Sequence, residues 1–295
     1  MDLVFSDIHA DIMALNSIIE LATSKDFEKK YGKLTRILNL GDLLERGTRP
    51  KQVLQKMAEL LQNYPMISVI GNHDEAFLYG REVSGSGPES IFAHRNLTEE
   101  VLTFFQKNYD DTYGNQEYLD KKASLLLVHG GPLDPKKITP KDAGHEAWLY
   151  QKSWQRLSDE GNEFFSFAGY HYSAPSAFAE AKTKLANPII LCGHQHTEAA
   201  LKQNKEGIQE ILSKIKLNTE KLSNYMVETK EIQIESGSNY LIRVGLAGPE
   251  GYHGVGDAKP HFGIVQYKPK KIILFGIQKK NKFFQGPRPR LIITK

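Results

Sequence analysis

The sequence predicts a globular α/β fold formed by one domain over residues 1–295. Three observations support this prediction. The first half alternates short apolar runs with amphipathic stretches, the pattern of βαβ units and a largely parallel sheet. The composition, 40% hydrophobic and 25% charged, is typical of a soluble globular chain with a buried core. Beyond Thr197 the apolar runs are separated by Gly-containing turns, which predicts antiparallel strands that close the domain.

The parallel part of the fold is predicted from five short apolar runs and the amphipathic stretches between them. Between the first two runs, apolar residues at three- and four-residue spacing predict a helix over 12–22, and a second helix is predicted over 51–61. The five predicted strands are Leu3–Ser6, Arg36–Leu40, Met66–Ile70, Leu125–Val128 and Ile189–Cys192.

The remaining elements are predicted from local signals. Gly, Ser and Pro residues clustered in 81–97 predict a loop, after which Thr98 heads a capping box that begins a helix. Further helices are predicted over 145–157, 175–185 and 206–216, so we expect inserted helical segments at about 135–186 and 200–222.

Charge and cysteine content restrict the cellular context and the partners. The single cysteine, Cys192, cannot form an internal disulfide, which suits a reducing compartment, and we expect a cytoplasmic protein without a membrane segment. Residues 1–257 carry a net charge of −7, which argues against a nucleic-acid partner. Residues 258–295 carry +10, and the alternation of lysines with apolar runs there predicts an edge strand with a solvated face.

Polar residues follow each of the five predicted strands directly. Because the carboxyl ends of strands in open α/β sheets converge on the ligand crevice, these residues should meet in one place. They comprise two aspartates, an asparagine and four histidines, which together predict a metal site. The candidate ligands are Asp7, His9, Asp42, Asn72, His129, His194 and His196.

The number of candidate ligands exceeds what one ion needs. A catalytic zinc takes three protein groups and a water, whereas these seven groups fill two sites if one carboxylate, most naturally Asp42, bridges them. Imidazole, carboxylate and amide ligands together favour two divalent transition-metal ions, with Mn, Fe or Zn ahead of Ni or Co, over Mg or Ca. Such a pair of ions can hold a hydroxide and neutralise two phosphoryl oxygens, which is the two-metal route to hydrolysis.

The series of strand-end motifs, D-x-H, G-D, G-N-H-D, V-H-G-G and G-H-Q-H, resembles the calcineurin-like metallophosphoesterase family over about residues 1–200. The local sequence around these motifs is similar to that of small bacterial members, including diadenosine-tetraphosphatase-like and phosphodiesterase types. The resemblance implies a four-layer αββα sandwich of two mixed β-sheets flanked by helices. It also implies that Asp7, His9, Asp42 and His196 hold one ion and that Asp42, Asn72, His129 and His194 hold the other. His73 would donate a proton to the leaving group.

The segment from Gly41 to Gly47 is similar to the G-D-x-x-D-R-G motif of phosphoprotein phosphatases. The resemblance implies that Arg46 grips phosphate oxygens, and the alternative is a structural ion pair with Glu45. Glu45 stands where those phosphatases have an aspartate that orients the catalytic histidine. Either Glu45 or Asp74 is then the candidate for orienting His73.

The sequence as a whole predicts a metal-dependent hydrolase of a phosphoester bond. The expected substrate is a phosphorylated small molecule, nucleotide or phosphoprotein, cut as a phosphomonoester. A phosphodiesterase or nuclease is the alternative enzyme, and a non-catalytic scaffold on the same fold is the alternative from another class. A scaffold should have lost ligands, and none of the seven positions has been lost.

Overall fold

The strands form two large sheets and one small pair in the computed structural model, which describes residues 1–81, 87–97, 99, 103–104, 115–158, 168–250 and 259–278. The strands are β1 (Asp2–Phe5), β2 (Arg36–Asn39), β3 (Met66–Ser68), β4 (Glu117–Asp120), β5 (Leu125–Val128), β6 (Arg156–Leu157), β7 (His171–Tyr172), β8 (Ile189–Cys192), β9 (Glu198–Asn204), β10 (Gly207–Glu210), β11 (Asn218–Leu222), β12 (Tyr225–Gln233), β13 (Asn239–Val244), β14 (His261–Tyr267) and β15 (Lys270–Ile277). The helices are α1 (Ile12–Ala22), α2 (Lys25–Tyr31), α3 (Pro50–Asn63), α4 (Asn72–Leu78), α5 (Pro88–Arg95), α7 (Pro135–Ile138) and α8 (Ala174–Lys182), with the 3-10 turns η1 (Gly144–Tyr150) and η2 (Leu212–Lys214).

Both large sheets are mixed. The seven-stranded sheet has the order β11-β12-β15-β14-β1-β2-β3, and β1, β2 and β3 are parallel within it. The six-stranded sheet has the order β10-β9-β13-β8-β5-β4, and β13, β8 and β5 are parallel. The five strands predicted from the apolar runs are therefore all present, but three belong to one sheet and two to the other.

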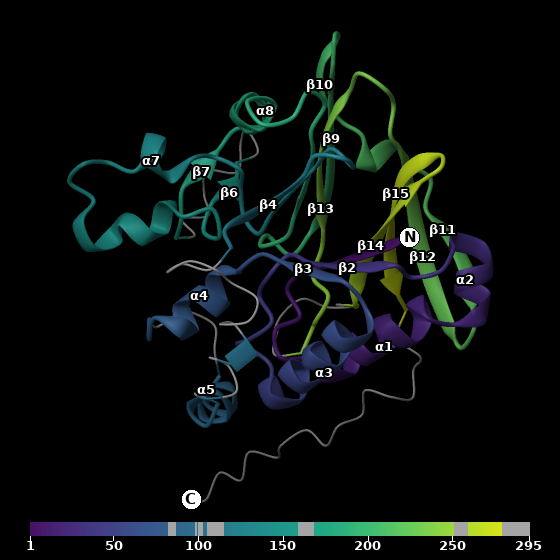
Figure 1. Ribbon diagram of the computed structural model, residues 1–295, viewed down its shortest axis with the longest axis horizontal. Helices are drawn as coiled ribbons and strands as arrows, with labels where there is room; N and C mark the ends of the chain where they lie inside the picture. Colours follow the sequence, from purple (N-terminus) through teal and green to yellow (C-terminus); the bar gives the residue numbers. More distant parts are fainter. Residues whose placement is uncertain are drawn as a thin grey trace, which may run out of the picture.

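The alternation of buried residues along these strands produces four layers. Leu3 and Phe5 in β1 pack with the helices α1, α2 and α3, whereas Val4 between them faces the core shared by the two sheets. On the six-stranded sheet, Leu125 and Leu127 face that shared core, and the residues that alternate with them pack against α8. Figure 1 shows the two sheets between α8 on one side and α1 and α3 on the other. The predicted αββα sandwich is confirmed.

The two helices predicted in the first half are confirmed, and their ends have clear local causes. Asp11 caps α1, because its side chain accepts a hydrogen bond from the backbone N–H of Ala14 at 2.9 Å. Pro50 begins α3 at a position where its missing N–H leaves no helical hydrogen bond unmade. Both helices bury one apolar face against the seven-stranded sheet.

The helix predicted over 206–216 is wrong. Gly207, at φ 121°, begins β10, which forms an antiparallel hairpin with β9, and only the short turn η2 follows. Ile208 packs against the cluster beside α8, whereas Ile211 and Ile215 pack against the core between the sheets. The apolar spacing suggested a single helical face, although these side chains serve two different layers. The segment 200–222 accordingly consists mostly of strands, not helices.

Two further predictions change. The helix predicted over 145–157 is replaced by the 3-10 turn η1 and then β6, whose residues pair with β7 and so cannot continue a helix. The predicted loop 81–97 contains α5, begun by Gly87 and Pro88. The helix start predicted at Thr98 lies outside the described residues. The helix predicted over 175–185 is confirmed as α8.

The basic strand near the C-terminus is not an edge strand. β15 lies between β12 and β14, because the β11–β12 hairpin extends the sheet beyond it. Its lysines are used internally: Lys271 pairs with Glu231 at 2.8 Å, and Lys270 donates to the carbonyl of Ala123. Among the described residues, no helix is both long and apolar enough to cross a membrane.

Candidate metal centre

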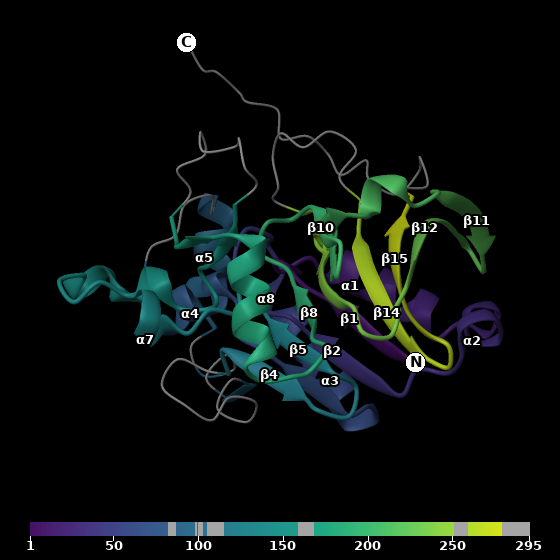
Figure 2. The same ribbon diagram turned by 90° about the horizontal axis from the view of Figure 1, so that it is seen from above.

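Each candidate ligand follows the carboxyl end of one parallel strand. Asp7 and His9 follow β1, Asp42 follows β2, and Asn72 begins α4 after β3, so the seven-stranded sheet supplies four of the seven. The six-stranded sheet supplies the other three: His129 after β5, and His194 and His196 after β8. Both views show α4 on the side of the sheets to which these ends point (Figures 1 and 2).

The seven residues form two groups whose potential ligand atoms lie close together. Asp7, His9, Asp42 and His196 form one group, and Asp42, His129 and His194 form the other, with all ligand atoms of a group within 4.8 Å of one another. Asn72 joins the second group, since its Oδ1 lies 3.1 Å from His129 Nε2. Asp42 therefore belongs to both groups. The two sets are those that the family resemblance implies.

The buried polar atoms of the site would be better satisfied by bound cations than they are by the protein alone. His129 Nδ1 lies 2.7 Å from the carbonyl oxygen of Leu40, to which its N–H donates, so Nε2, 3.2 Å from Asp42 Oδ2, is the nitrogen left to bind a cation. In the described structure, Asp42 Oδ2 and His194 Nε2 are buried and lack hydrogen-bond partners. Buried polar atoms left this way are energetically unfavourable, and a bound cation would satisfy both.

The pKa values of the buried carboxylates and histidines are shifted by burial and by the charges of their neighbours. Burial alone lowers the pKa of His129, but the charge of Asp42 outweighs burial and raises the pKa to about 9. Burial would raise the pKa of Asp42, yet the neighbouring histidines, His129 foremost, hold it well below its usual range. Burial lowers the pKa of His9 and that of His194. The arrangement thus favours ionised carboxylates beside neutral His9 and His194, whereas the raised pKa keeps His129 protonated at pH 7, and metal binding would displace that proton.

The backbone at the site is held in a conformation that L-residues rarely adopt. Asp7, His9, Asp42, His194 and His196 all have positive φ, between 47° and 69°. Each left-handed residue costs about 1 kcal/mol or more, so the surrounding contacts must stabilise it. For example, both carboxylate oxygens of Asp7 accept hydrogen bonds from the backbone N–H of His194, at 3.0 and 3.2 Å.

Glycines next to the ligands allow this close packing. A Cβ on Gly71 would lie 2.0 Å from Asp42 Oδ1, and a Cβ on Gly193 would lie 1.9 Å from Ser6 Oγ. Both distances are far below any real contact. Glycine is therefore required at these two positions for the carboxylates of Asp42 and Asp7 to lie where they do.

His73 and Arg46 lie beside the two ligand groups. The ring of His73 packs edge-on against His9, with centroids 5.0 Å apart, and its Nε2 lies 3.4 Å from Arg46 Nη2. The backbone N–H of His73 donates to Asp42 Oδ1 at 2.9 Å, which attaches α4 to the shared carboxylate. Burial lowers the pKa of His73 to about 4; the charge of Asp42 offsets part of this effect, and the charge of Arg46 adds a smaller lowering contribution.

Asp74 is engaged with the backbone rather than with His73. Its Oδ1 accepts hydrogen bonds from Leu43 and Leu44 at 3.0 and 3.1 Å, and its Oδ2 accepts one from Gly71 at 3.3 Å. Within the described structure His73 Nδ1 has no hydrogen-bond partner. Asp74 therefore fixes the loop that carries Asp42 instead of orienting His73 by a hydrogen bond. Burial and the charge of Asp42 raise the pKa of Asp74 to about 7.

Sequence reasoning missed two residues that shape the site. His94 in α5 accepts a hydrogen bond from the backbone N–H of Glu45 at 2.7 Å. Gln195, between two candidate ligands, forms hydrogen bonds with both the N–H and the carbonyl of Leu157, each at 2.9 Å. The available signal for α5 was Pro88 after Gly87 with Glu89 in the first turn, a typical helix start.

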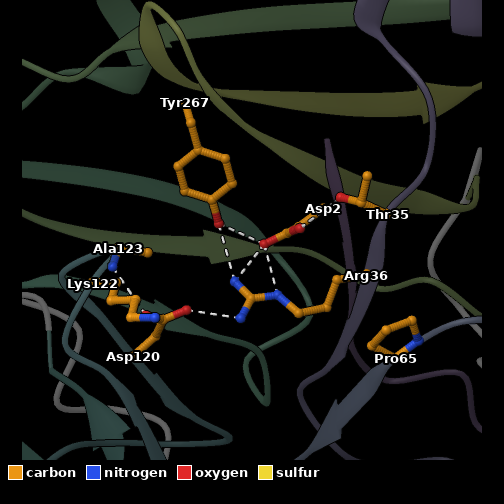
Figure 3. Close-up of a pocket in the computed structure, with 8 residues that line it drawn as sticks. All are labelled: Asp2, Thr35, Arg36, Pro65, Asp120, Lys122, Ala123 and Tyr267. Atoms are coloured by element: carbon orange, nitrogen blue, oxygen red, sulfur yellow. Dashed lines mark hydrogen bonds and ion pairs between the residues drawn. The ribbon is translucent and has the colours of Figure 1, made fainter.

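The cavity in Figure 3, about 390 Å³, is distant from this site in the fold. It lies at the amino-terminal ends of β1 and β2, where Asp2 and Arg36 stand. Arg36 donates to Asp2 and to Asp120, and Tyr267 donates to Asp2, as the dashed lines in Figure 3 show. Because Asp2, Arg36, Asp120 and Tyr267 already pair with one another, this cluster joins the two sheets.

Comparison with known proteins agrees with the geometry. Residues 3–198 match the model of the calcineurin-like phosphoesterase family. A metallophosphoesterase structure from Sphaerobacter thermophilus is similar over 95% of this chain and 89% of its own, with 20% identity and a TM-score of 0.55. A hypothetical protein from Pyrococcus horikoshii OT3 is similar over 96% and 90%, with 11% identity and a TM-score of 0.58.

The two similar structures support the assignment of the fold, and the family match supports the class of reaction. No curated protein sequence matches the chain significantly. The matched range contains every strand-end motif and both groups of potential metal-binding residues. The protein therefore belongs to the calcineurin-like phosphoesterase family, and it is a metal-dependent hydrolase of phosphoester bonds.

Proposed function

We propose that the protein hydrolyses a phosphomonoester with two divalent transition-metal ions, Mn, Fe or Zn, held at the two ligand groups. The observation that carries the proposal is the place of Asp42 in both groups. One carboxylate between two otherwise separate sets of ligands is the arrangement that places two ions a few ångströms apart. When bound, the ions supply an activated water and neutralise charge on the phosphoryl oxygens.

The residues of the chain would divide the remaining work. Asp7, His9, Asp42 and His196 would hold one ion, and Asp42, Asn72, His129 and His194 the other. His73, whose Nδ1 has no hydrogen-bond partner in the described structure, would give a proton to the departing oxygen. Because its pKa is about 4, the negative charge of the bound phosphoryl group would first have to raise that pKa so that the ring takes up the proton it donates. Arg46, 3.4 Å from His73, would bind the phosphoryl oxygens that the ions leave uncovered.

Arg46 favours a phosphomonoester over a diester. A monoester dianion has three unesterified oxygens, of which two can face the ions, so the third needs a separate donor. A diester has one such oxygen fewer and one negative charge less. The chemistry suits a phosphorylated small molecule, nucleotide or phosphoprotein as substrate. A phosphodiesterase is the outcome that would replace this proposal.

Two wider features belong to the same proposal. The chain would act as one domain over 1–295, because β14, from the last part of the described chain, pairs directly with the N-terminal strand β1. The only cysteine, Cys192, is buried as a free thiol, and we assign the protein to the cytoplasm.

Metal analysis of the purified protein, followed by steady-state rates with mono-aryl and bis-aryl phosphates, tests the proposal. We expect close to two ions per chain and faster turnover of the monoester. Asp42→Asn should lose far more than half of the metal, because both groups depend on it. A single ion retained by Asp42→Asn with full activity would refute the shared carboxylate, and faster turnover of the diester would refute the substrate class.

A further inference from the structure

The side chain of His94 forms two hydrogen bonds that fix its tautomer. Its Nε2 accepts the backbone N–H of Glu45 at 2.7 Å, so its Nδ1 carries the proton and donates to the carbonyl of Ser90 at 2.6 Å. The residue is 3% exposed. It therefore links α5, through a single buried acceptor, to the loop that follows Asp42.

That loop needs support, because Glu45 and Arg46 are consecutive left-handed residues with φ of 69° and 67°. Neither is glycine, so this conformation is unfavourable unless hydrogen bonds hold it. Before the turn, Asp74 accepts hydrogen bonds from the N–H groups of Leu43 and Leu44. After it, the carbonyl of His9 accepts a hydrogen bond from the N–H of Gly47 at 3.0 Å. His94 accepts the hydrogen bond from the N–H of Glu45, the first of the two left-handed residues.

His94 also contacts the helix that carries His73. The ring of Phe77, one turn after His73 in α4, packs edge-on against the ring of His94 with centroids 5.6 Å apart. The two elements that His94 contacts, the turn after Asp42 and α4, also meet each other, since Arg46 Nη2 lies 3.4 Å from His73 Nε2. His94 thus touches both elements whose side chains meet at the edge of the metal centre.

We propose that His94 is a positioning residue that holds the Glu45–Arg46 turn in its left-handed conformation and so places the Arg46 guanidinium against His73 and the phosphoryl group. This rests on the proposed function for the role of Arg46. The hydrogen bonds of His94 go to Glu45 and Ser90, neither of which belongs to the two ligand groups.

Two substitutions separate the two hydrogen bonds. His94→Gln places an amide oxygen near the position of Nε2 and keeps an acceptor for Glu45. His94→Asn places an amide nitrogen near Nδ1, so it keeps the donor to Ser90 and loses the acceptor. Ser90→Ala is the matched control, because it changes an equally buried residue of α5 whose carbonyl, not its hydroxyl, serves His94.

The variants are compared as manganese-loaded enzymes with a mono-aryl phosphate. We expect His94→Asn to lower kcat/KM roughly tenfold, the effect of a buried N–H left unpaired, with unchanged metal content. His94→Gln should recover most of this loss, and Ser90→Ala should match the parent enzyme. In an Arg46→Ala background, His94→Asn should cause no further loss, because the group it positions is absent.

The backbone amide of Glu45 supplies a readout that needs no turnover. Its hydrogen exchange should be slow in the parent and in His94→Gln and fast in His94→Asn. Equal losses in His94→Gln and His94→Asn, a full additional loss in the Arg46→Ala background, or unaltered Glu45 exchange in His94→Asn would each overturn the inference. A parent enzyme that hydrolyses no phosphoester would overturn the proposed function instead, and the exchange rates would still decide the role of His94.

Discussion

Asp42 concentrates the chemistry of the site in one side chain. Its Oδ1 accepts the N–H of His73, while its Oδ2 lies 3.2 Å from His129 Nε2 and 3.8 Å from His9 Nε2, one histidine from each ligand group. The carboxylate therefore ties the helix of the proposed proton donor to the ligands of both proposed ions. Substitutions near Asp42 should act on metal binding, whereas substitutions at the rim should act on turnover.

His73→Asn should keep both metal ions and slow hydrolysis, more strongly for alkyl than for aryl phosphates. Alkoxide leaving groups are poor and need a proton in the transition state, whereas aryl oxides leave more readily without one. The measurement is kcat for a matched pair of alkyl and aryl monoesters, with metal content determined on the same sample. Equal losses on the two esters would show that His73 binds phosphate without donating a proton.

Arg46→Ala should lower monoester turnover by about 10²–10³, the scale of losing one transition-state donor, and should affect diesters clearly less. Both rates are measured in one metal-saturated preparation with mono-aryl and bis-aryl phosphates. Lys51→Ala, a change at an exposed residue of the nearby helix α3, serves as the charge control. If the monoester loses no more than the diester, Arg46 is not a phosphate clamp.

At this scale the sequence predicted which residues would meet, because each followed a recognisable strand. It did not predict what supports them. Asp74 was a candidate for orienting His73, yet its oxygens receive the backbone of the Asp42 loop. His94 lay in a segment that read as a loop. Such contacts join residues far apart in the chain, and no local pattern encodes them.

At the scale of elements, the helix α4 shows how tightly the site is packed. Its N-cap residue, Gly71, has φ −88° and ψ 166°, an extended conformation that any residue can adopt. Glycine is needed there only because a Cβ would lie 2.0 Å from Asp42 Oδ1. Gly87, the N-cap of α5, has nearly the same backbone angles, φ −76° and ψ 164°, but open space around it.

Gly71→Ala should therefore displace the Asp42 carboxylate and lower the metal content, whereas Gly87→Ala should retain it. The two changes share the same position in a helix and the same intrinsic effect on its end, so their difference reports the contact with Asp42. Metal content and urea unfolding of both variants provide the measurement. Equal metal content in the two variants would contradict the crowding argument.

The elements that sequence reasoning placed correctly are those with one buried face and a clear period, such as α1 and the five parallel strands. It failed where one segment contributes to two layers. Ile208 and Ile211 have helical spacing, but Ile208 in β10 and Ile211 just after it pack into different cores. Tertiary pairing with β9 overrides the local period there. The same applies to β6, which its pairing with β7 defines.

At the scale of the whole molecule, charged clusters join the two sheets at both ends. Beside the metal centre, Glu198 of the six-stranded sheet accepts hydrogen bonds from Lys230 at 2.8 Å and from His261 at 2.9 Å, both in the other sheet. Burial would raise the pKa of Glu198, but these two partners outweigh burial and lower it. The folded protein therefore favours the ionised carboxylate.

A carboxyl with a lowered pKa stabilises the folded state above its unfolded pKa of about 4.3 and loses that contribution as pH falls through the folded pKa. The free energy of unfolding should thus be lower for Glu198→Gln than for the parent at pH 7, and the difference should shrink below about pH 4. Urea unfolding across this range is the measurement. Glu206→Gln, in the exposed turn between β9 and β10, is the control. A difference independent of pH would show that the ion pairs contribute nothing.

The division of the ligands between the two sheets makes each proposed cation a removable cross-link. Each ligand group combines side chains from the seven-stranded sheet with side chains from the six-stranded sheet, so an ion there bridges residues that lie more than a hundred positions apart in the chain. Because such binding favours only the folded state, free metal at about 100 times its dissociation constant should add about 2.7 kcal/mol to the free energy of unfolding. The midpoint of unfolding should then rise with the logarithm of metal concentration in the parent and stay nearly constant in Asp42→Asn. Availability of the metal would in this way regulate the stability of the fold as well as its activity.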